Sequence, residues 1–93
     1  MDNEGSLYVV WLNKGEAREP EFAVRFVRHG AVGSTAEPIK FLGEEALWAF
    51  LALSLSIGTG HVQSALSELH GKGSAEIASL NIPDDDLRRL KLV

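Results

Sequence analysis

Two glycine-rich segments are the first residues that could bind a ligand, because a glycine loop before a helix can hold phosphate. Gly58 and Gly60 precede a helical pattern, but the third glycine of a dinucleotide-binding loop would fall on Gln63. Residues 71–74 contain the letters of a phosphate-binding loop in the wrong order, and they follow a helix rather than a strand. Both segments therefore predict helix boundaries and not a phosphate site.

The histidines and the acidic run do not have the spacing of a metal site. His61 and His70 are nine residues apart, which places them on opposite sides of a helix at ~100° per residue. His29 ends a predicted strand, and no carboxylate is placed beside it by the sequence. The three aspartates at 84–86 follow Pro83, a position that favours helix capping over cation binding. We expect no metal and no cofactor.

Nucleophilic catalysis is not predicted either. Ser34 and Thr35 lie in a glycine-rich loop at 30–38, without a nucleophile elbow or an identifiable base. The chain has no cysteine, which excludes a disulfide framework, a thiolate zinc site and a cysteine nucleophile. We expect a protein that is not an enzyme.

Composition and charge set the class of protein. The chain has 93 residues, 45% hydrophobic and 24% charged, with a formal net charge of −4, and we expect one globular domain over 1–93. The negative charge argues against a nonspecific nucleic-acid or anionic-membrane surface. An acidic start and the lack of a ~20-residue apolar run predict neither export nor a membrane span. We expect a cytoplasmic protein.

The segment 7–12 predicts the first strand, because it is β-branched and aromatic and is followed by turn residues. One side of it carries Leu7, Val9 and Trp11, and the other carries Tyr8, Val10 and Leu12. Apolar residues on both sides are typical of a strand that is covered on both faces.

The other strands have weaker patterns. Residues 21–29 alternate and predict a second strand, antiparallel to the first through the polar loop at 13–20. A short third strand is predicted at 39–42, and a last strand at 74–82. On that last strand, one face is predicted to carry Ala78, Leu80 and Ile82.

Three helices complete the pattern. The first begins after Gly43 with two glutamates in its first turn, a staple between Leu42 and Leu47, and a left-handed end at Gly58. The second covers about 61–70, and a short one follows Pro83. The order is β-β-(β)-α-α-β-α. It predicts an α+β fold, with a small antiparallel sheet of three to four strands and helices mainly on one face.

More apolar surface is present than one small core readily covers. The staple turns the arc with Leu47, Phe50 and Leu53 toward the sheet, which leaves a second apolar arc on the same helix. With the helices on one face, one side of the first strand also points away from them. The predicted association surface consists of Tyr8, Val10, Leu12, Trp48, Leu51, Ala52 and Leu55.

A second copy of the chain is the expected partner for this surface, which would make the protein a homodimer. Another protein at a sheet edge or at the apolar helix face is the other possibility of this kind.

Two alternatives belong to other classes. The helix at 61–70 could act in a nucleic-acid-binding regulator, but its exposed face offers no arginine or lysine, so nucleic acid is not the expected partner. A small-molecule pocket between sheet and helix would be lined by Trp11, Phe22 and Phe50, with His29 or Arg25 at its mouth.

Overall fold

The computed structural model describes residues 4–30 and 37–92. Within them the chain is α+β, with a four-stranded antiparallel sheet, three α-helices and one π-helical segment in the expected order. The elements are β1 Glu4–Trp11, β2 Glu21–Arg28, β3 Ile39–Leu42, α1 Glu44–Ala49, η1 Phe50–Ser54, α2 Thr59–Lys72, β4 Ser74–Asn81 and α3 Asp84–Arg89. Residues 31–36 of the glycine-rich loop, with Ser34 and Thr35, lie outside the described residues.

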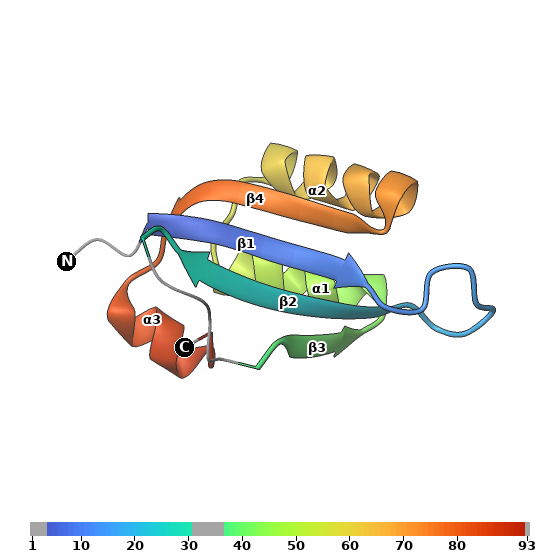
Figure 1. Cartoon of the computed structure of the whole chain (residues 1–93), viewed down its shortest axis with the longest axis horizontal. Helices are drawn as coiled ribbons and strands as arrows, with labels where there is room; N and C mark the ends of the chain where they lie inside the picture. The colour runs from blue at the N-terminus through green and yellow to red at the C-terminus, as the bar shows by residue number, and fades with distance from the viewer. Residues whose placement is uncertain (1–3, 31–36, 93) are drawn as a thin grey trace.

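The sheet has the strand order β3-β2-β1-β4, and every neighbouring pair is antiparallel. Figure 1 shows α1 behind β1 and β2, α2 alongside β4, and α3 at the end of the sheet where β1 begins. The front of β1 and β2 is crossed by no described helix in this view. The sheet therefore has an inner face that packs on helices and an outer face that does not.

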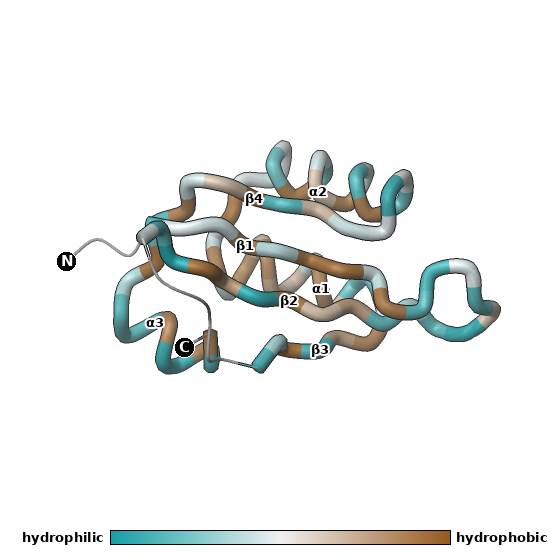
Figure 2. Tube along the Cα trace, viewed as in Figure 1, coloured by the Kyte–Doolittle hydropathy of each residue, from teal (hydrophilic) through white to brown (hydrophobic). Residues whose placement is uncertain are grey.

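The inner face and the helices form the core. Alternate residues of β1 and β2 point inward and are buried, and they join buried side chains from the helices and from β4 in one cluster. Figure 2 shows the brown, hydrophobic segments of these elements side by side across the molecule. The core includes Leu7, Val9, Phe22, Val24, Phe26, Leu47, Phe50, Leu51, Val62, Ala65, Leu69 and Ile77.

A bulge in β4 changes the predicted pattern of the last strand. The register with β1 shifts between Gly5 and Leu7, where an extra residue enters β4, and Ser79 has a φ of 58°. The bulge reverses the alternation, so that Ala75 and Ile77 point inward before it. Ala78 is exposed, which contradicts its predicted place on a face with Leu80 and Ile82.

The start of α1 is where the sequence placed it. Gly43 is the N-cap with a φ of 92°, a backbone conformation that residues other than glycine rarely adopt. Its N–H donates to Pro20 O at 2.7 Å. The predicted staple was wrong. Leu42 follows the alternation of β3, lies with Lys40 on the outer face and is 61% exposed, whereas Leu47 is buried in the core.

The end of the first helix differs from the prediction. After Ala49 the helix becomes π-helical, and Leu55 N–H donates to Phe50 O, five residues earlier. The left-handed residue is Ser56, with a φ of 54°, and not Gly58, which is the N-cap of α2 with a φ of −58°. Ile57 N–H then donates to Leu51 O, a six-residue closure that returns the chain to the core.

The last two helices lie in the predicted segments, but the residues at which they begin or end differ from the prediction. α2 begins two residues earlier than expected, and Gly73 closes it in the left-handed conformation, as expected for helix punctuation. In α3 the N-cap is Pro83, without a side-chain cap, so the three aspartates occupy the first turn. In the first turn their carboxylates suit the helix dipole.

Candidate association surface

The outer side of β1 carries three exposed apolar side chains in succession. Tyr8 is 37% exposed, Val10 43% and Leu12, just past the strand, 49%. Their neighbours Leu7 and Val9 are fully buried on the inner face. Because side chains alternate along a strand, the three exposed residues share one face. The structure thus decides which side of the first strand points away from the helices, and β1 is not covered on both faces by described elements.

The strand register shows what lies beside each of these residues. Tyr8 is paired with Arg25 on β2 and with Glu76 on β4, so a cation and an anion stand on either side of it. Val10 is paired with Ala23 and Ser74, which are small. The centre of the outer face is therefore formed by apolar residues with small neighbours. A positive charge, that of Arg25, lies on its β2 side, and a negative charge, that of Glu76, lies on its β4 side.

The row of the outer face nearest the hairpin carries a leucine on each side of Glu21. Leu12 N–H donates to Glu21 O at 2.8 Å, and Glu21 is paired with Leu42 on β3. Leu42 was not assigned to this surface from the sequence, although its position two residues after Lys40 places both side chains on the same face of β3. We define the outer face by Tyr8, Val10, Leu12, Glu21, Ala23, Arg25, Lys40, Leu42, Ser74 and Glu76.

A groove adjoins this face at the β4 side. It has a volume of ≈ 290 Å³ and runs between β4 and α2. Its lining includes Tyr8 and Val10 from the outer face, Glu76 from β4, and Glu68 and Lys72 from α2. The outer face therefore ends in a hollow with two carboxylates and one ammonium group.

The predicted helix residues do not form one surface. Leu51 is fully buried, so its assignment to an association surface was wrong. It lies four residues after Leu47 and therefore on the same side of the helix. Ala52 and Leu55 are partly buried against the core, and only Trp48 is exposed, at 37%.

Leu53 is the most exposed large hydrophobic residue among those described, at 73%, and the sequence analysis had placed it against the sheet. It is six residues after Leu47, a spacing that turns it away from the core. Trp48 is on α1 and Leu53 on η1, which continues α1 in the helix layer behind the sheet (Figure 1), whereas Tyr8, Val10 and Leu12 are exposed on the side of β1 that faces away from that layer. The two groups are on opposite sides of the molecule.

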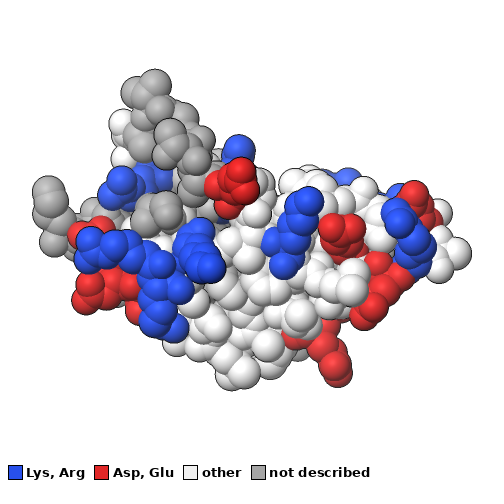
Figure 3. All heavy atoms as spheres, turned by 90° about the horizontal axis from the view of Figure 1, so that it is seen from below, with Lys and Arg blue, Asp and Glu red and all other residues white. Residues whose placement is uncertain are grey.

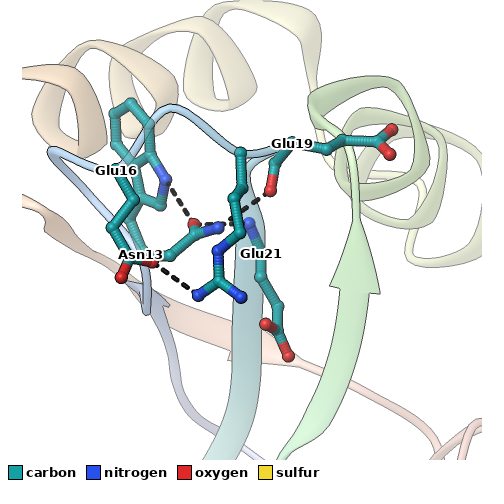
Figure 4. Close-up of polar contacts among 6 residues, drawn as sticks. Asn13, Glu16, Glu19 and Glu21 are labelled. Carbon is teal, nitrogen blue, oxygen red and sulfur yellow. Dashed lines mark hydrogen bonds and ion pairs between the residues drawn. The ribbon is translucent and has the colours of Figure 1, made fainter.

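A polar cluster fixes the hairpin loop beside the outer face (Figure 4). The buried Asn13 donates from Nδ2 to Glu19 O at 2.8 Å, and its Oδ1 accepts from Glu21 N–H at 2.8 Å and from Trp11 Nε1 at 3.1 Å. Arg18 and Glu16 form a separate, exposed ion pair. Asn13 uses its amide to close the loop, so the cluster is structural.

One histidine and two of the aspartates make side-chain contacts within the fold. His70 Nε2 lies 3.0 Å from Glu44 Oε1, and the His70 ring meets the Trp11 ring edge-on, with centroids 5.5 Å apart. Asp85 and Asp86 pair with arginines three residues later, each at 3.0 Å. Among residues 4–30 and 37–92, no three His, Cys, Asp or Glu side chains gather closely enough to hold a metal ion.

The charge pattern bears on the nucleic-acid alternative. The exposed residues of α2 include Gln63, Ser64, Ser67 and Glu68, and Lys72 in its last turn is the only lysine or arginine of this helix. The basic side chains at the α3 end in Figure 3 are interleaved with acidic ones, and Arg88 and Arg89 are held in ion pairs. Neither helix presents the unpaired basic footprint that phosphate backbones require.

The predicted small-molecule pocket is occupied by the protein's own core. Phe22 and Phe50 are buried, Phe22 packs against Trp11 with ring centroids 5.8 Å apart, and Phe50 packs against Phe41 at 4.7 Å. Arg25 is on the outer face with Tyr8, away from these rings, so it does not stand at the mouth of such a pocket.

Within the described part of the chain, no helix is both long and apolar enough to cross a bilayer. The chain matches no protein-family model, no curated protein and no solved structure.

Proposed function

We propose that the protein is a non-enzymatic association module, and that it forms a homodimer through the outer face of its sheet. The observation that carries the proposal is the succession of exposed Tyr8, Val10 and Leu12 on a face that no described helix crosses. Contiguous exposed apolar side chains on an ordered surface mark association sites more often than isolated ones do. A symmetric dimer covers such a surface on both copies at once.

The size of the face is suited to a small interface. Strand spacing of ~4.8 Å and a rise of ~3.4 Å per residue give four strands a projected area of roughly 450 Å². The accessible surface of the side chains that stand on it is larger than this projection. Specific interfaces at the lower end of the size range bury ~600 Å² per partner.

The composition of the chain bears on the cell compartment. A chain without cysteine has no thiol to protect and no disulfide to form, so it is suited to a reducing compartment. We propose the cytoplasm as the place where the dimer acts.

Light scattering after size-exclusion chromatography tests the proposal. A chain of 10.1 kDa should elute with twice that mass at micromolar concentration and dissociate on dilution. Val10→Asp should elute as a monomer with an unchanged far-UV circular dichroism spectrum, because the new carboxylate would have to be buried at the interface.

Leu53→Asp is the matched control, since it places the same charge on an exposed leucine of the opposite side. It should leave the dimer intact. A wild-type mass near that of one chain at every concentration would overturn the proposal, and so would a Val10→Asp protein that is still dimeric.

A further inference from the structure

On the basis of the proposed dimer, we infer its arrangement: two copies stack outer face to outer face about a two-fold axis that runs along β1. In this arrangement Arg25 of each copy lies opposite Glu76 of the other. The charge pattern of the outer face carries the inference, because it matches itself in this orientation.

The row through Tyr8 shows the match most clearly. Arg25 is paired with Tyr8 on the β2 side, and Glu76 is paired with it on the β4 side, and all three side chains are exposed. A half-turn about an axis along β1 keeps each row in place and exchanges the β2 side with the β4 side. Each arginine then faces a glutamate of the second copy, and the dimer contains this pair twice.

The next row fits the same rotation. Val10 lies on the axis between Ala23 and Ser74, two small residues that allow the sheets to approach. Beyond Ala23, Lys40 is on β3, and the half-turn carries it across β4 to the groove beside α2. That groove of ≈ 290 Å³ carries the carboxylates of Glu68 and Glu76 together with Lys72. A lysine from the second copy would therefore enter a hollow with an excess of negative charge.

The competing arrangement has its axis across the strands. With the axis through the Tyr8 row, Arg25 meets Arg25 and Glu76 meets Glu76. With the axis through the Val10 row, Arg25 would face Glu21, but Lys40 would meet Lys40. Like charges placed opposite each other are unfavourable, so the axis along β1 is the better match. Its strands also keep the near-aligned crossing of ~30° that is common for stacked sheets.

A charge-exchange experiment tests the arrangement, with dimer dissociation constants measured by analytical ultracentrifugation at low salt. Arg25→Glu alone should weaken the dimer at least tenfold, and so should Glu76→Arg alone, because each places like charges opposite each other twice. The double variant Arg25→Glu/Glu76→Arg should return to within about threefold of the wild type. Circular dichroism checks that each variant is folded.

Arg25→Glu/Glu21→Arg is the matched control, because it restores the charge pair of the competing axis only. Recovery in this control, or no recovery in the exchange of residues 25 and 76, overturns the arrangement along β1. A dimeric wild type with a monomeric Val10→Asp variant leaves the proposed function standing in either case. A monomeric wild type overturns the proposed function and this arrangement with it.

Discussion

Val9 and Val10 are adjacent residues of the same type on the same strand, and they have opposite environments. Val9 is fully buried against the helix layer, whereas Val10 is 43% exposed on the outer face. The strand geometry sends them to opposite faces, and the helices cover only one of those faces. The apolar residues of β1 therefore contribute to the core on one face and to an exposed apolar surface on the other.

The difference arises from the number of layers that the chain can build. α1, η1 and α2 are all used to cover the inner face, where their buried residues join those of β1 and β2. No described helix is left for the outer face. The inner valine is therefore expected to affect folding, and the outer one to affect association.

Replacing each of the two valines by aspartate should give the largest difference in stability between the two faces of β1. Val9→Asp should unfold the protein, because it buries a carboxylate without a partner, which costs several kcal/mol of a total stability of ~5–15 kcal/mol. Val10→Asp should remain folded, because its carboxylate is in water in the monomer. Far-UV circular dichroism and urea titration of the two variants would compare them. A folded Val9→Asp protein with wild-type stability would show that the inner face is not the core.

The first helix offers the same contrast at a smaller scale. Leu51→Ala should lower the free energy of unfolding by ~2–5 kcal/mol, because it leaves a cavity in the core. Leu53→Ala should change it by no more than ~0.5 kcal/mol, because Leu53 is 73% exposed. Urea midpoints of the two variants measure the difference. Equal midpoints would contradict the helix phase described above.

The hairpin loop extends the contrast to polar side chains. Asn13→Ala should destabilise the protein by ~1–3 kcal/mol, because the buried amide bonds to Glu19 O, Glu21 N–H and Trp11 Nε1 would be lost. Arg18→Ala, which removes the exposed ion pair with Glu16, should change stability by less than ~1 kcal/mol. Thermal unfolding followed at 222 nm compares them, and a larger effect for Arg18→Ala would reverse the interpretation of Figure 4.

The α+β class and the element order could be predicted because they depend on local patterns. Alternation at 21–29 and the glycines at the ends of helices are set by neighbouring residues, and they agree with β2, Gly43 and Gly73. The bulge at Ser79 could not be predicted, because it depends on how β4 meets β1. The same is true of the choice between the two faces of β1, which depends on where the helices pack.

The candidate surface was predicted in part. Tyr8, Val10 and Leu12 were recognised as one set because they alternate along a strand, and the structure shows all three exposed. Leu51 and Leu53 were exchanged, although four-residue spacing from Leu47 already favours Leu51 as the buried one. Arg25 and Glu76 could not be joined to Tyr8 from the sequence, because their pairing follows from the register of three strands.

The smallest expected change in stability concerns the π-helical end of the first helix and the turn that follows it at Ser56. In a straight helix Ser54, seven residues after Leu47, would point to the core, but the π-helical segment exposes Ser54 and partly buries Leu55 instead. The chain then turns through Ser56, whose φ of 54° disfavours any residue with a Cβ.

Ser56→Gly should therefore raise the free energy of unfolding by ~0.5 kcal/mol, since relief of the left-handed conformation exceeds the greater entropy that glycine has in the unfolded chain. Ser54→Gly is the matched control. Its position is right-handed helical, so the same substitution should lower stability by ~0.5 kcal/mol. Urea midpoints that move in opposite directions for the two serines would place the left-handed turn at Ser56, and a shift of both in the destabilising direction would contradict it.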